Sequence, residues 1–180
     1  MQSASTTIID LQIVLDATGI PGEADFRQWA DVALSHARDQ EQDGKGLAQP
    51  VEITVRVVDE NESRQLNHEY RDKDNATNVL SFPNELPDFL RGQLDTLPLG
   101  DLVICAPVVT AEAAAQHKNV REHWAHLTIH GVLHLLGFDH LEDDEAEAME
   151  AMEISALQQL GISNPYEADE EKDRQGQHHE

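Results

Sequence analysis

Residues 130–140 read HGVLHLLGFDH, an apolar segment that carries three histidines. His130 and His134 are four residues apart, so on a helix both imidazoles project from one face at adjacent turns. Gly137 follows three residues later, and glycine adopts the left-handed conformation that ends a helix at little cost. The resulting turn would bring His140 back towards the other two rings. The segment therefore predicts a central helix whose end gathers three imidazoles at one point.

Three neutral imidazoles with an open fourth position are the ligand set of a catalytic zinc site, which activates a bound water. The alternative is that the histidines are incidental, because a lone histidine on a buried helix is usually satisfied by a hydrogen bond. Clustering three ionisable rings on an apolar helix costs stability unless something ligates them. We therefore expect one Zn²⁺ per chain, bound by His130, His134 and His140 together with a water or the substrate.

The spacing of these histidines matches the H-E-x-x-H-x-x-G-x-x-H motif of metzincin proteases, with one difference. The glutamate that serves as general base in those peptidases is replaced here by Gly131. Without a carboxylate beside the metal-bound water, peptide hydrolysis loses its proton shuttle. The pattern keeps the metal ligands and favours an anionic substrate whose hydrolysis is assisted by a cation.

The length of 180 residues is enough for one globular domain with its own core. The single cysteine, Cys105, excludes a disulfide framework and suits a reducing cytosol, and we expect it in the core. No apolar run approaches the roughly 20 residues of a membrane span. The first seven residues, MQSASTT, lack the pattern of a secretory signal, so we expect a cytoplasmic protein.

The chain is strongly acidic, with 12 Lys and Arg against 35 Asp and Glu and a net charge of −23. Taken alone, this balance argues against a nucleic-acid-binding protein, which usually has a basic face. The acidic residues are concentrated at the end of the chain, since residues 141–180 hold 13 acidic and 2 basic side chains. We therefore expect one domain over 1–166 and an acidic disordered tail over 167–180.

Hydrophobic spacing predicts the remaining elements. Strands are expected over 8–15, 51–57, 77–82 and 102–105, and helices over 26–37, 59–70, 107–116, 120–136 and 142–160. Asp59 and Glu62 form a capping-box-like start, and Gly161 suits a helix end. Residues 84–100 are expected to form a long surface excursion. The predicted fold is α+β, a single domain with a mixed four-stranded sheet packed by five to six helices and a zinc site on a central buried helix.

Several blocks resemble the YbeY family, the metal-dependent endoribonucleases of ribosomal RNA maturation. The histidine segment follows HWAH at 123–126, and the other blocks are LNHEYR at 66–71, TNVLSFP at 77–83, LGDLVIC at 99–105, EDDEAE at 142–147 and NPY at 164–166. The resemblance covers roughly Ile8 to Tyr166. A longer polar loop over 40–49 and the acidic tail depart from the family pattern without touching a motif.

The resemblance implies that His130, His134 and His140 are the zinc ligands, and that Arg71 and His130 are required for activity. A guanidinium can bind a phosphate through two hydrogen bonds and stabilise charge in the transition state. Without the resemblance, we would interpret Arg71 as a cation near the carbonyls at a helix end.

Five further residues have open interpretations. His126 is either a neighbour of the ligands or substrate, or a packed histidine. Asn78 and Ser81 could bind ribose or phosphate, or could close a strand end. Asp101 and Asp139 are candidate acceptors for the second N–H of a ligand histidine.

The resemblance implies a single-strand-specific, metal-dependent endoribonuclease that acts in ribosomal RNA processing, including maturation of the 16S rRNA 3′ end, in ribosome biogenesis and in ribosome quality control. The implied partners are ribosomal RNA and the ribosome or its associated proteins, with neither DNA nor membrane. Two alternatives remain: a non-catalytic zinc-containing ribosome assembly factor, and a metalloprotease-like hydrolase.

The middle of the chain offers basic side chains beside the expected metal, including Arg56, Arg71, Lys73, Arg91, Lys118 and Arg121. They could form a local anion site, but the net charge makes long-range attraction for RNA weak. We therefore expect poor affinity for naked RNA and targeting through partners.

Overall fold

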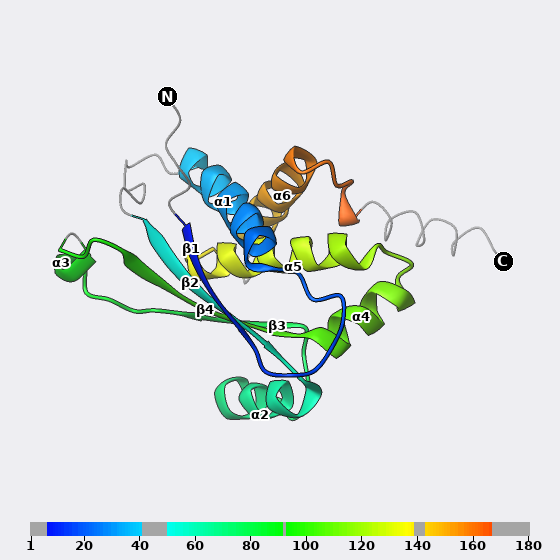
Figure 1. Cartoon of the computed structure of the whole chain (residues 1–180). Helices are drawn as coiled ribbons and strands as arrows, with labels where there is room; N and C mark the ends of the chain where they lie inside the picture. The colour runs from blue at the N-terminus through cyan, green and yellow to red at the C-terminus, as the bar shows by residue number, and fades with distance from the viewer. Residues whose placement is uncertain (1–6, 41–49, 92, 139–142, 167–180) are drawn as a thin grey trace.

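The computed structural model describes residues 7–40, 50–91, 93–138 and 143–166. Its centre is a mixed four-stranded sheet with the strand order β1-β2-β4-β3 (Figure 1). The strands are β1 (Thr7–Ile13), β2 (Val51–Val58), β3 (Val79–Pro83) and β4 (Leu97–Cys105). The first three strands in this order are parallel, and β3 pairs antiparallel with β4. Within the described part of the chain, β3 is therefore an edge strand.

Helices cover both faces of the sheet (Figure 1). One face is covered by α1 (Glu23–Gln40), α5 (Val120–Leu135) and α6 (Asp143–Gln159), and α2 (Glu60–Arg71) lies on the opposite face. α4 (Ala106–Ala115) continues directly from β4, and α3 (Asp88–Arg91) is a single turn. The predicted α+β fold with a mixed four-stranded sheet is confirmed. No helix in the described part of the chain is long and apolar enough to cross a membrane.

α5 is the central helix of the fold. Ten of its sixteen residues are buried, because it lies between the sheet and the pair formed by α1 and α6. Alternation along β2 points Val51, Ile53, Val55 and Val57 into this main core, and all four are fully buried. A smaller core of Val58, Leu80, Val103 and Cys105 lies on the other side of the sheet. The predicted burial of Cys105 is confirmed.

The ends of the helices follow the local sequence signals. The side chain of Asp59 accepts a hydrogen bond from the backbone N–H of Glu62 at 2.9 Å, as the capping-box spacing predicts. Gly137 and Gly161 have φ values of +98° and +80°, so both turn the chain at a helix end. After Gly161 the chain turns back towards α5, where Tyr166 contacts His126.

The prediction of a surface excursion over 84–100 is wrong at its end, because β4 begins at Leu97. Leu97 and Leu99 are buried, and Leu97 pairs with Val51 of β2. Pro98 suggested a loop, but it lies in the part of β4 that extends beyond β3. The last residue of β3, Pro83, pairs with Gly100 of β4. A missing N–H is tolerated where a strand has no neighbour on that side. The loop prediction over 41–49 and the tail prediction over 167–180 lie outside the described residues.

Candidate active site

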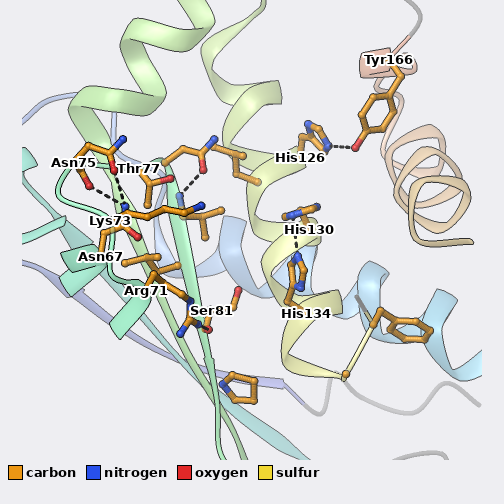
Figure 2. Close-up of a pocket in the computed structure, with 17 residues that line it drawn as sticks. Asn67, Arg71, Lys73, Asn75, Thr77, Ser81, His126, His130, His134 and Tyr166 are labelled. Atoms are coloured by element: carbon orange, nitrogen blue, oxygen red, sulfur yellow. Dashed lines mark hydrogen bonds between the residues drawn. The ribbon is translucent and has the colours of Figure 1, made fainter. Parts of the chain in front are cut away.

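A cleft of about 860 Å³ opens between α5 and the segment that runs from the end of α2 to β3 (Figure 2). α5 contributes His126, His130 and His134 to one wall. The opposite wall includes Arg71 and Ser81. The fold thus brings the two predicted catalytic residues, Arg71 and His130, to opposite sides of one cavity.

His130 and His134 converge at the tips of their rings. Their Nε2 atoms lie 3.0 Å apart, and the ring planes are inclined at 76° (Figure 2). A tetrahedral zinc ion with Zn–N bonds of 2.0–2.1 Å holds its nitrogens about 3.3 Å apart. The two nitrogens therefore suit adjacent ligand positions of one metal. Among the described residues no group of three histidines, cysteines or carboxylates could hold a metal. His140, the predicted third ligand, and Asp139 lie outside the described residues.

The other ring nitrogen of His130 contacts a buried carboxylate. Its Nδ1 makes a short hydrogen bond with Oε1 of Glu153, a residue of α6 that is only 1% exposed. Burial opposes the ionisation of Glu153, but hydrogen bonds with His130 and Tyr166 and the nearby ring of His126 outweigh it and lower its pKa to about 2. A carboxylate on the second nitrogen is the usual arrangement for a metal-ligating histidine.

Sequence reasoning missed Glu153 and proposed Asp101 and Asp139 as candidates for this role. Asp101 is exposed and lines a different hollow, with Glu52 and Thr54, so this interpretation is wrong. A signal for Glu153 was present, because it lies within the apolar stripe of α6 beside Met149 and Met152, both buried. A charged side chain at such a position needs a partner.

Arg71 lies at the end of α2, where the chain leaves the helix. The next residue, Asp72, caps the helix in a left-handed conformation. The guanidinium of Arg71 donates to the carbonyl of Ser81 at 2.9 Å and to that of Tyr70 at 3.2 Å, and it lies 5.2 Å from the centroid of the Phe82 ring. The side chain is exposed to the cleft. Arg71 therefore contacts a helix-end carbonyl, as its structural interpretation predicts, and is also open to an anion.

The loop that follows Arg71 is held by two buried side chains of α2. Asn67 Nδ2 donates to the carbonyl of Asn75 at 2.8 Å and to its side-chain oxygen at 3.1 Å. Ser63 accepts a hydrogen bond from the N–H of Thr77 and donates to its carbonyl, each at 3.0 Å. These contacts fix the wall opposite the histidines, and the spacing of motifs in the sequence did not indicate them.

The contacts of three further side chains, Asn78, Ser81 and His126, bear on the roles that the sequence left open for them. Asn78 accepts from the N–H of Val79 and donates to the carboxylate of Glu112, so it closes the start of β3, and it also lines the cleft. Ser81 lines the cleft and donates to the carbonyl of Gly131 at 3.2 Å. His126 also lines the cleft, and its Nε2 lies 3.3 Å from the hydroxyl of Tyr166.

Gly131 faces the sheet, next to Leu102 of β4 and Ser81 of β3. A Cβ atom at this position would lie 2.7 Å from Cδ2 of Leu102 and 3.3 Å from Oγ of Ser81. A glutamate at position 131, as in a metzincin protease, would therefore have to displace Leu102, and its side chain would start towards β4. This geometry counts against the metalloprotease alternative.

The sequence model of the family described as Endoribonuclease YbeY matches residues 16–161. The chain belongs to this family. The resemblance inferred from the sequence blocks is thus confirmed, and the YbeY match includes both Arg71 and the histidine segment.

Three curated relatives, each named Endoribonuclease YbeY, support the assignment. The Pseudomonas putida (strain W619) protein is 54% identical over 165 residues, which are 92% of this chain and 96% of the relative. The Pseudomonas savastanoi pv. phaseolicola protein is 52% identical over 92% and 91% of the two chains. The Colwellia psychrerythraea protein is 50% identical over 88% and 96%. A solution structure from Thermotoga maritima overlaps 87% of this chain and 95% of its own, with a TM-score of 0.49 and 23% identity.

Proposed function

We propose that this chain is a zinc-dependent endoribonuclease that hydrolyses phosphodiester bonds in single-stranded RNA. The observation that carries the proposal is the cleft in which the converging Nε2 atoms of His130 and His134 lie across from the guanidinium of Arg71 (Figure 2). Membership of an endoribonuclease family supports RNA as the substrate. The cellular role that we propose is ribosomal RNA processing, including maturation of the 16S rRNA 3′ end, ribosome biogenesis and quality control in the cytoplasm.

One Zn²⁺ would be held by His130, His134 and His140, the last of which lies outside the described residues. When bound, this ion would supply a Lewis acid and lower the pKa of a water in the cleft. The donor chemistry fits, because neutral imidazoles are common zinc ligands and Glu153 occupies the other nitrogen of His130.

The residues on the opposite wall act on the substrate. A phosphodiester is anionic, and Arg71 is the only guanidinium among the described residues that line this cleft. A guanidinium can donate two parallel, charge-assisted hydrogen bonds to one phosphate. Its guanidinium would bind the scissile phosphate, orient it towards the histidines and stabilise the charge that develops on its oxygens. A peptidase of the metzincin type requires a carboxylate at position 131 as general base, and this chain has a glycine there.

The acidic net charge of the chain favours targeting by partners over direct binding of free RNA. Because the net charge is −23, long-range attraction for naked RNA is weak, and the cleft itself supplies only a local cationic site from Arg71 and Lys73. We therefore propose that the ribosome or its associated proteins deliver the RNA. Tight binding to random RNA at physiological salt would contradict this part of the proposal.

The test is turnover of single-stranded RNA by the zinc-loaded protein, with and without a chelator. Cleavage should stop on chelation, return with Zn²⁺, and fall at least about 1000-fold in His130→Ala, since removing the metal removes several kcal/mol of stabilisation. The matched control is His36→Ala on α1, which should leave the rate unchanged, because His36 is not among the residues that line the cleft and its ring hydrogen-bonds to the carbonyl of Val32 in its own helix.

Three results would count against the proposal. Unchanged cleavage in His130→Ala would identify a contaminating nuclease as its source. Stoichiometric zinc binding without any RNA turnover would instead support the non-catalytic assembly factor. Chelator-sensitive cleavage of a casein-like substrate would favour the metalloprotease alternative.

A further inference from the structure

Glu153 is a charged side chain in an apolar environment. It is 1% exposed and lies on the face of α6 that also buries Met149, Met152 and Leu157. Burying a carboxylate is costly unless each of its oxygens is hydrogen-bonded, so a residue of this kind is kept only where its partners compensate. The zinc ligands that the resemblance implies do not include Glu153.

The two carboxylate oxygens of Glu153 have separate partners. Oε1 contacts Nδ1 of His130, and Oε2 accepts a hydrogen bond of 2.5 Å from the hydroxyl of Tyr166. His126 completes the group, with its Nε2 3.3 Å from the hydroxyl of Tyr166 and 3.7 Å from Oε2. Three elements therefore meet at one carboxylate: α5, α6 and the segment that follows α6.

The contact with Glu153 decides which nitrogen of His130 carries the proton. An ionised carboxylate only accepts hydrogen bonds, so Nδ1 of His130 must be the N–H donor in this contact. In a neutral ring the lone pair then resides on Nε2, the atom that lies 3.0 Å from Nε2 of His134. The same contact fixes the rotation of the ring about its χ angles.

We propose that Glu153 is the positioning residue for His130, and that Tyr166 in turn positions Glu153. Glu153 holds the His130 ring in the Nδ1–H tautomer with Nε2 directed at the metal position. This inference deepens the proposed function and rests on it.

Tyr166, near the end of the domain, contacts both Glu153 and His126. Gly161 turns the chain after α6, and the N–H of Tyr166 is fixed by the side chain of Asn164 at 2.8 Å. The Tyr166 ring then packs edge-on against His126, with the centroids 5.5 Å apart (Figure 2). The NPY block at 164–166 therefore has a physical role, because it presents one hydroxyl to the free side of Glu153.

The experiment compares Glu153→Gln and Tyr166→Phe with the wild-type full chain. Glu150→Gln is the matched control, since it makes the same change one turn earlier on α6 at an exposed position. The first readout is the zinc dissociation constant from competition with a chromophoric chelator. The second is the tautomer of His130, read from its ¹⁵N chemical shifts in the metal-free protein at a fixed, neutral pH.

We expect Glu153→Gln to weaken zinc binding about 10- to 100-fold. The carboxamide oxygen would accept from Tyr166, leaving its NH₂ to donate to His130 Nδ1, so the tautomer should change to Nε2–H. Tyr166→Phe should weaken zinc binding less, by up to about 10-fold, with the Nδ1–H tautomer retained. Glu150→Gln should match the wild type in both readouts. Because Gln has the shape of Glu, thermal melts should show a cooperative fold for all variants.

The outcomes separate this inference from the proposed function. A wild-type protein without zinc affinity would overturn the proposed function, while the tautomer in the metal-free protein still tests Glu153. A Glu153→Gln variant that keeps the Nδ1–H tautomer and binds zinc within about twofold of the wild type would overturn the inference. A loss of zinc affinity in Glu150→Gln equal to that in Glu153→Gln would also overturn it, because the effect would then be one of general charge.

Discussion

The two walls of the cleft are fixed in opposite ways. The α5 wall belongs to the main core, and the buried Glu153 holds His130 from behind. On the other wall, Arg71 is exposed, and it is anchored by hydrogen bonds to two backbone carbonyls. The loop that follows Arg71 is held by Asn67 of α2, which is buried on the face of the sheet opposite the main core.

This difference matches what each wall must do in the proposed reaction. Metal ligands need fixed positions within a fraction of an ångström, which a packed helix provides. A group that binds and releases a long anionic substrate needs access, which an exposed guanidinium at a helix end provides. Substitutions on the α5 wall should therefore affect metal binding or folding. Substitutions on the other wall should affect only the binding and turnover of the substrate.

The largest effect is expected for His134→Ala on the α5 wall. Loss of one of the converging Nε2 atoms should abolish tight zinc binding and lower RNA cleavage at least about 1000-fold. Zinc content after dialysis and initial cleavage rates measure the two effects. A variant that retains stoichiometric zinc and wild-type rates would show that the α5 wall is not the metal wall.

Arg71→Ala should separate the two walls. Zinc affinity should stay within about twofold of the wild type, while kcat/KM falls about 100- to 1000-fold, because a charge-stabilising donor is lost. Arg71→Lys should recover only part of the activity, since an ammonium cannot form the two-bond fork. Weakened zinc binding in Arg71→Ala would break the proposed division between the walls.

Gly131→Ala should reduce stability by about 1–2 kcal/mol, because the cost of displacing Leu102 within the main core exceeds the roughly 1 kcal/mol that Ala gains over Gly inside a helix. Urea unfolding of the metal-free protein measures the change. The matched control is Gly22→Ala, where the nearest atom to a new Cβ is a side-chain oxygen of Asp25 at 3.9 Å. Equal stability of the two variants would show that α5 is not pressed against β4 at this point.

The smallest effect concerns pH at the far end of α5. Burial lowers the pKa of His123 below its ordinary value, although its hydrogen bond with Glu112 opposes this shift. At His123 the folded protein then binds fewer protons than the unfolded chain. The contribution of His123 to the free energy of unfolding is therefore complete above about pH 6.5 and declines as the pH falls below that value. Between pH 7.5 and 5.5 the Tm of the wild type should fall a few degrees more than that of His123→Asn. Parallel pH profiles would contradict this.

Features set by neighbouring residues could be predicted from the sequence. The four-residue spacing of His130 and His134, the helix end at Gly137 and the Asp59 cap depend on local backbone geometry, and each is found in the structure. The apolar character of residues 120–136 likewise predicts a buried helix without knowledge of its neighbours.

Features set by the meeting of distant elements could not be predicted in the same way. Glu153 contacts His130 across 23 positions of sequence, and only the packing of α6 on α5 brings them together. The start of β4 depends on pairing with β2, which overrides the local preference of Pro98 for a loop. The role of Asn67 depends on the path of the loop that returns past α2.

The position of β3 at the edge of the sheet gives Arg71 a second consequence. An edge strand exposes carbonyl groups with which a strand of another molecule could pair, a common route to aggregation. Arg71 occupies the carbonyl of Ser81, near the middle of this edge, and places a positive charge over it. The side chain that we propose binds RNA therefore also covers part of this edge, and a charged side chain on an edge strand opposes pairing with a second strand.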